Sequence, residues 1–168
     1  RNNNIAALTR LKELQQSDGS WAWYKGMNGS RFITNFIVEL NARLALLTGK
    51  PLVGYAVTMQ RSAFSFLNKE ALEEYKNIRK AEKNGEKVKG LSDEALKYLY
   101  LVAISGENML LADNLTANNY FLSKVGETLT SRSMTNKALA AIVLDKAGRK
   151  QEALNFIASL KEFLTKTD

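Results

Sequence analysis

The sequence contains no cysteine and no histidine in its 168 residues. Without cysteine the chain forms no disulfide and has no thiol nucleophile, and without either residue it lacks the usual ligand sets of zinc, iron and copper sites. The imidazole that most often serves as a general base is missing as well. We therefore expect no catalytic residue, no metal and no cofactor in this chain.

Proline and long apolar runs are also scarce. Pro51 is the single proline, and the 10 glycines stand mostly alone, which favours helices over a turn-rich β architecture. No apolar run approaches the ~20 residues that span a bilayer, so we expect no transmembrane segment. The start, Arg1-Asn2-Asn3-Asn4, has neither an initiator methionine nor the apolar core of a signal peptide, and we expect a piece of a longer, processed protein.

Acidic residues are in deficit, with 17 Asp and Glu against 24 Lys and Arg, for a net charge of +7. No aromatic residue lies between Tyr75 and Tyr98 to stack on the bases of a nucleic acid. The positive residues between these two tyrosines form a charge run, and such a run is usually a solvated helix face. We interpret it that way and expect no nucleic-acid partner. The excess of positive charge lies in one stretch, at Lys76, Arg79, Lys80, Lys83, Lys87 and Lys89.

Apolar residues recur at helical spacing almost everywhere, and nothing alternates with period two for long enough to form a strand. Gly49 ends the most apolar helix, and we expect Pro51 near the start of the next, which extends to Leu67. A polar exposed helix and loop follow at about 68–91. Ser92 begins a further helix that Gly106 ends, and three more cover about 116–129, 134–147 and the residues after Gly148. The most apolar helix carries the stripe Ile33, Phe36, Ile37, Leu40, Leu44 and Leu47.

The prediction is an all-α fold of seven or eight helices in a single domain, residues 1–168. Short loops between successive helices favour antiparallel helix pairs, which build either a linear solenoid or a closed α/α toroid. The sequence lacks self-similarity at a period of about 34 residues, which counts against a regular solenoid. The segment 147–154 nevertheless looks like one solenoid repeat junction.

The most distinctive stretch follows the first helix and contains Gln-x-x-Gly-x-Trp, formed by Gln16, Gly19 and Trp21. Asp18 and Gly19 predict a tight turn, because glycine adopts positive φ freely. The glutamine side chain can both donate and accept at backbone groups near the helix ends, and the tryptophan can pack a large apolar surface between helix pairs. We expect packing roles for these residues.

The run from Gln16 to Trp23, a loop containing Gly26 and Gly29, and the long apolar helix that opens at 31–34 resemble the thioester domain of bacterial α2-macroglobulins. The thioester domains of complement proteins are similar at the corresponding place. Residues 136–160 also resemble the later helix pairs of that family. The likeness covers most of the chain and is specific around residues 11–48.

The resemblance implies part of an α/α toroid within a large extracytoplasmic protein, periplasmic or anchored at the outer membrane or cell surface. Family members act as broad-spectrum protease traps, so the implied partners are proteases, met through the full-length protein, and other domains of the same chain. The reactive Cys-x-Glu-Gln motif of the family lies upstream of the Gln-x-x-Asp-Gly stretch, and this chain contains no cysteine. No catalytic residue is therefore carried over. The resemblance implies structural roles for Gln16, Asp18, Gly19, Trp21 and Trp23, and no enzyme activity.

Two alternatives stay open. One is a helical-repeat scaffold that binds polypeptides along a groove. The other is a carbohydrate-active α/α enzyme in which Trp21, Trp23 and Tyr24 form a stacking platform, and it requires two carboxylates about 5–10 Å apart. Candidates by composition alone are Asp18, Glu39, Asp93, Glu94, Asp113 and Glu127. A partial toroid would also leave apolar helix faces uncovered, which predicts self-association.

Overall fold

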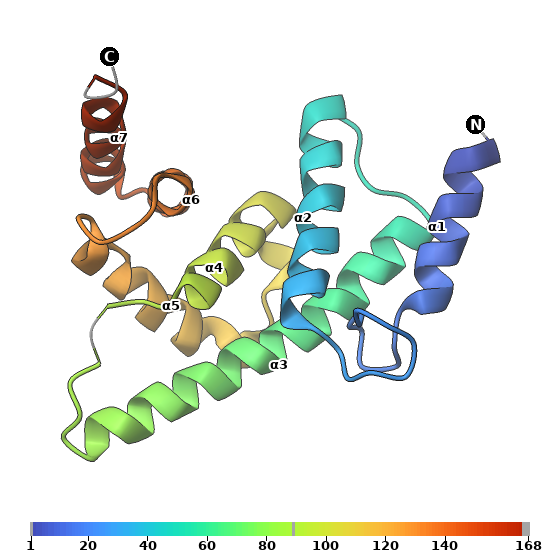
Figure 1. The fold of residues 1–168 in the computed structure, drawn as a ribbon, viewed down its shortest axis with the longest axis horizontal. Helices are drawn as coiled ribbons and strands as arrows, with labels where there is room; N and C mark the ends of the chain where they lie inside the picture. Colours follow the sequence, from blue (N-terminus) through green and yellow to red (C-terminus); the bar gives the residue numbers. More distant parts are fainter. Residues whose placement is uncertain (1, 89, 166–168) are drawn as a thin grey trace. The chain divides into compact units, whose positions relative to one another are not determined.

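The computed structural model describes residues 2–88 and 90–165, so Arg1, Lys89 and residues 166–168 lie outside the described residues. The described chain is all-α, as predicted, and forms no strand (Figure 1). The α-helices are α1 Asn2–Leu14, α2 Arg31–Thr48, α3 Tyr55–Lys83, α4 Asp93–Ser105, α5 Leu115–Lys124, α6 Met134–Lys146 and α7 Lys150–Thr165. Three 3₁₀ helices, η1 Glu107–Met109, η2 Ala112–Asn114 and η3 Val125–Thr128, lie between them.

The start of α3 differs from the prediction. Pro51 was expected near the beginning of this helix, but Pro51 lies in an irregular segment and α3 begins at Tyr55. Gly54 has φ +58°, a left-handed conformation that no residue inside a right-handed helix adopts, so the helix begins after it. The polar stretch from residue 68 is helical to Lys83 and is followed by a loop, and its helix is the second half of α3, which continues unbroken through residues rich in Lys, Glu and Ala.

Predicted helix ends are mostly correct. Gly49 closes α2 in the left-handed conformation with φ 63°, and its N–H donates to Leu46 O. The Ser92 hydroxyl caps α4 by accepting from the Ala95 N–H at 3.0 Å. Gly106 and Gly148 follow α4 and α6 directly or within two residues.

The chain divides into two compact units. Unit 1 comprises Arg1–Glu70 and Ile104–Leu110, and unit 2 comprises Ala71–Ala103 and Leu111–Asp168. In unit 1 the core is formed by the first half of α3 and the inner side of α2, with Val38, Met59, Phe64 and Leu67 fully buried. Five polar residues described in unit 1 are also buried, Ser20, Thr34, Asn41, Gln60 and Asn68.

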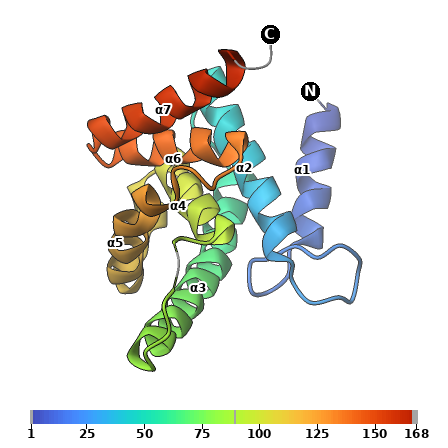
Figure 2. The same cartoon turned by 60° about the vertical axis from the view of Figure 1, so that its left-hand side comes forward.

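Unit 2 is centred on α4, whose residues from Ala95 to Val102 are buried except for Lys97. A helix buried on every side is typical of the centre of a core. The ring of Phe121 packs edge-on against Tyr75 and Tyr98, at centroid distances of 6.3 and 6.4 Å. In the same unit, α6 and α7 lie side by side and are joined at Ala147-Gly148-Arg149 (Figure 2).

Candidate functional site

The predicted turn at Asp18-Gly19 is present in unit 1 and is held by a dense set of hydrogen bonds. The Gln16 N–H donates to Ser20 O at 2.8 Å, and the Gly19 N–H donates to Gln16 O at 2.9 Å. The Asp18 carboxylate accepts from the Ser20 N–H at 2.9 Å and from the Ser20 hydroxyl at 2.6 Å. Every polar group named here therefore serves the turn itself.

Two adjacent glutamines fix the turn to its surroundings. Gln16 donates through Nε2 to Met27 O at 2.7 Å, which ties the start of the loop to its far side. Gln15 donates through Nε2 to both Gly19 O and Met59 O, each at 2.9 Å, so it bonds the turn to α3. The Gln-x-x-Gly-x-Trp pattern marked Gln16 only, and the contact of Gln15 was missed because its partner lies 44 residues away.

Gly19 lies directly against the backbone of α3. Its φ is +91°, and a Cβ added there would lie 1.8 Å from Ser62 O. Both the conformation and the contact require glycine. The contact between the loop after α1 and α3 therefore leaves no room for a side chain at residue 19.

Trp21 joins three elements of unit 1. Its ring is buried, with 2% of the residue exposed, and Nε1 donates to Leu11 O of α1 at 2.8 Å. Its backbone N–H donates to the Thr34 hydroxyl of α2 at 3.0 Å, and its carbonyl accepts from the Ser30 N–H at 2.8 Å. A ring buried in this way is not available to stack on a sugar.

Trp23 lies two residues further on and is exposed, with 58% of its surface accessible. Its ring stacks on Phe32 of α2 at a centroid distance of 5.6 Å and an interplanar angle of 9°. A hollow of about 450 Å³ beside it is lined by Trp21, Trp23 and Tyr24, and the carboxylate in its lining is Glu13, which pairs with Arg10 at 3.1 Å. A glycosidase needs two carboxylates in its cleft, whereas the described lining of this hollow supplies one.

The outward side of α2 carries a continuous apolar strip, which we call the α2 apolar face. Its members recur at steps of three or four residues, so they share one side of the helix. They are 57–86% exposed. The opposite side of α2 is buried and consists of Thr34, Val38, Asn41 and Ala42. The α2 apolar face consists of Phe32, Phe36, Leu40, Leu44 and Leu47.

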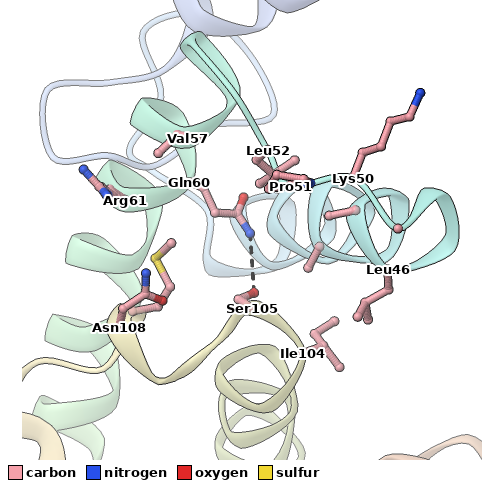
Figure 3. A pocket seen from close by; sticks show the side chains of 14 residues that line it. Leu46, Lys50, Pro51, Leu52, Val57, Gln60, Arg61, Ile104, Ser105 and Asn108 are labelled. Carbon is pink, nitrogen blue, oxygen red and sulfur yellow. Dashed lines mark hydrogen bonds between the residues drawn. The ribbon is translucent and has the colours of Figure 1, made fainter.

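A second hollow of unit 1, the α2–α3 pocket, has a volume of about 570 Å³. Its walls come from the second half of α2, the segment 49–52, the start of α3 and the residues at the end of α4 and in η1 (Figure 3). Apolar side chains dominate these walls, among them Leu46, Leu52, Val57 and Ile104. The size and the lining are those of a small-molecule site.

A network of amides and hydroxyls supports the α2–α3 pocket from within. Gln60 is 1% exposed, and its Nε2 donates to Val38 O at 3.1 Å and to the Ser105 hydroxyl at 3.5 Å (Figure 3). Its Oε1 accepts from Asn41 Nδ2 at 3.3 Å. Gln60 is therefore fully bonded, whereas the Ser105 hydroxyl accepts one bond and retains a proton to donate.

Two cations, Lys50 and Arg61, line the α2–α3 pocket, and no carboxylate was found in its lining. Both residues are exposed, and in Figure 3 their charged ends extend outward from the segment 49–52 and from α3. Long flexible side chains of this kind can turn toward a bound group. Both charged side chains of the lining are positive, which suits an anion if they turn toward it.

Three titratable groups described in unit 2, Glu82, Tyr120 and Arg132, have shifted pKa values. The Tyr120 hydroxyl donates to Glu82 at 2.7 Å, and this bond lowers the pKa of Glu82, with Arg79 adding to the effect. Burial, followed by the bond to Glu82, raises the pKa of Tyr120 from 10.0 to about 12. The pair links α3 to α5, and Glu82 also lines a hollow of about 640 Å³ in unit 2.

Arg132 forms a buried clamp in the same unit. It donates to Asp93 Oδ1 and to Leu91 O, both at 2.7 Å, and burial lowers its pKa. Asp93, one of the candidate carboxylates, is thus paired at the start of α4. Three others are also engaged locally: Asp18 with Ser20, Glu39 with Arg43, and Glu127 with Lys124.

Over the described range, no three acidic side chains gather into a group able to hold a metal ion. None of the helices described is both long and apolar enough to cross a lipid bilayer. No family model, curated protein or solved structure matches the chain.

Proposed function

We propose that this chain is a non-catalytic structural module of a large extracytoplasmic protein that resembles the α2-macroglobulins. In this proposal its helices form part of an α/α toroid, and proteases meet it only through the full-length protein, which acts as a trap. The observation that carries the proposal is the α2 apolar face. The module would bury this face against another domain of the same protein.

The number of exposed apolar side chains on the α2 apolar face favours a permanent contact. Full burial of a Leu or Phe side chain contributes about 1.5–3 kcal/mol, so covering the five side chains of the α2 apolar face contributes several kcal/mol. Contiguous apolar surface of this kind marks interaction sites on folded domains. Trp23, stacked on Phe32, extends the same face into the loop.

The turn at Asp18-Gly19 supports a structural role rather than a catalytic one. The amide groups of Gln15 and Gln16, the Asp18 carboxylate and the Trp21 indole all bond within unit 1. A catalytic group needs a free atom directed at a substrate. These side chains are committed to holding α1, α2 and α3 together.

A helical scaffold that binds polypeptides is the second candidate, because the same apolar face suits a partner helix. The two functions differ in what happens to a protease. A trap encloses the protease and blocks large substrates while small ones still enter, whereas a scaffold leaves both activities unchanged.

The test uses the intact protein that contains this chain, incubated with trypsin. Residual activity is measured on casein and on a small chromogenic amide. We expect activity on casein to fall at least tenfold while activity on the amide persists. The double substitution Leu40→Asp/Leu44→Asp places two charges on the α2 apolar face and should abolish the shielding, whereas Lys69→Asp, on an exposed position of α3, should not.

Full activity of trypsin on casein would overturn the trap and favour the scaffold. Shielding that survives the double substitution would instead show that the α2 apolar face is not the contact. Release of a thiol from the intact protein by methylamine would indicate a thioester that attaches the protease covalently. Without such release, trapping would be non-covalent.

A further inference from the structure

We propose that the α2–α3 pocket binds a medium-chain fatty acid, with the alkyl chain among the apolar walls and the carboxylate at the opening. This inference is independent of protease trapping. It rests on three features of the pocket: its volume, the segregation of apolar from polar groups, and the sign of the charge at its opening.

The volume and the walls suit an alkyl chain. The pocket holds about 570 Å³, within the range of about 300–1,000 Å³ that small-molecule sites occupy. Leu46, Leu52, Val57 and Ile104 present aliphatic groups from four separate segments of unit 1. Each methylene transferred from water to such walls contributes about 0.8 kcal/mol, so affinity should rise with chain length.

The polar groups of the pocket match a carboxylate. Gln60 holds Ser105 in place, and the remaining proton of Ser105 can be donated to a carboxylate oxygen. Asn108 adds a side-chain amide in the same lining. Lys50 and Arg61 supply positive charge, and neither forms an ion pair with any residue that the structure describes. An ammonium headgroup would find no counter-charge there.

The experiment titrates the chain, labelled with ¹⁵N, with decanoate below its micelle concentration, and with decanol and decylamine as matched probes. We expect amide shifts confined to residues 42–61 and 104–109. Decanoate should bind about tenfold more tightly than decanol, which corresponds to one favourable charge interaction, and decylamine should bind more weakly still.

Two sets of variants separate the pocket from the charge. Val57→Phe reduces the volume and should weaken decanoate and decanol alike. Lys50→Glu/Arg61→Glu changes only exposed side chains, so the fold is kept, and it should remove the preference for decanoate over decanol. The control Lys25→Glu/Lys69→Glu changes net charge equally, away from the pocket, and should leave that preference intact.

Equal affinity for decanoate and decanol would overturn the assignment of a carboxylate. Shifts centred on residues 32–40 of α2, outside the pocket, or no saturable shifts with any probe, would overturn the pocket as the site. Preference for decanoate that falls equally in both double variants would show non-specific attraction to a basic protein, which also contradicts the proposal.

Discussion

Units 1 and 2 of this chain reach compactness in different ways. Unit 2 surrounds α4 with apolar side chains and packs Tyr75, Tyr98 and Phe121 edge-on. Unit 1 buries several polar side chains and leaves the α2 apolar face exposed. Unit 2 also buries Asn114, Arg132 and Lys137, so the clearest difference is the continuous apolar face that α2 of unit 1 leaves exposed.

Directional bonds hold unit 1 together where apolar area is missing. Gln15, Gln60 and Asn68 donate through their side-chain amides to the carbonyls of Met59, Val38 and Met109. Val38 and Met59 lie inside α2 and α3, so their carbonyls accept these bonds in addition to the helical ones. Removing one of these side-chain donors therefore costs about 0.5–1.5 kcal/mol, the net contribution of a typical hydrogen bond. We therefore expect the stability of unit 1 to depend on backbone geometry and hydrogen bonds, and that of unit 2 to depend on the volume of its buried side chains.

The prediction with the largest expected effect on stability tests the apolar core of unit 2. Phe121→Ala removes a fully buried ring and should destabilise unit 2 by about 3–5 kcal/mol. Phe36→Ala makes the same change on the α2 apolar face, where 61% of the residue is exposed, and should cost less than about 0.5 kcal/mol. Hydrogen exchange, read separately in each unit, measures both. Equal costs would erase the distinction between the units.

The next effect tests the dependence of unit 1 on geometry. Gly19→Ala combines positive φ with a clash against Ser62 O and should destabilise unit 1 by more than about 3 kcal/mol. Gly26 has a similar φ of +88° with open space around it, so Gly26→Ala should cost only about 1–2 kcal/mol. Denaturation followed by fluorescence of the tryptophans, both in unit 1, gives the comparison. If the two variants behave alike, the close approach of the loop to α3 is not present in solution.

The third prediction has a smaller expected effect and tests the buried Arg132 clamp of unit 2. Arg132→Met keeps much of the side-chain volume but removes the bonds to Asp93 and Leu91, and should cost about 1–3 kcal/mol. Arg10→Met removes an exposed pair with Glu13 and should change stability by less than about 0.5 kcal/mol. Urea denaturation of both variants measures the difference, and a neutral Arg132→Met would show that the clamp is dispensable.

The smallest effect concerns pH. The pKa of Tyr120 is raised above its ordinary value of 10.0 to about 12, so its stabilisation is complete below pH 10 and is lost as the pH rises through about 12. Glu82 acts in the opposite direction: its pKa is lowered, so its contribution is lost as the pH falls through that lowered pKa. Tyr120→Phe should flatten the fall in melting temperature between pH 10 and 12, and Tyr24→Phe, at an exposed tyrosine, should not. An unchanged slope in Tyr120→Phe would contradict the link between Tyr120 and Glu82.

The sequence predicted the local features of the fold well. The stops at Gly49, Gly106 and Gly148 and the cap at Ser92 depend on backbone conformation and on partners within a few residues, so they can be read along the chain. The turn at Asp18-Gly19 was predictable for the same reason. The exception was the start of α3, where Pro51 suggested a helix and the left-handed Gly54 delayed it to Tyr55.

The candidate site could not be predicted in this way. The α2–α3 pocket takes its walls from residues 42–61 and 104–109, and Gln15 finds its partner in Met59. A pattern in neighbouring residues does not indicate which distant segments of the chain lie in contact. Trp21 and Trp23 make the same point, since both occur in one short motif, yet one is buried and the other is exposed.

By itself, the sequence determined that this protein is helical, where most of its helices end, and that it has no histidine or cysteine chemistry. Those properties follow from composition, from periodicity and from contacts between near neighbours. Only the tertiary structure decided which side of α2 faces the core, because an apolar stripe at helical spacing looks the same whether it is buried or exposed. Burial is set by what packs against the helix, and in unit 1 that is the side with Thr34, Val38, Asn41 and Ala42.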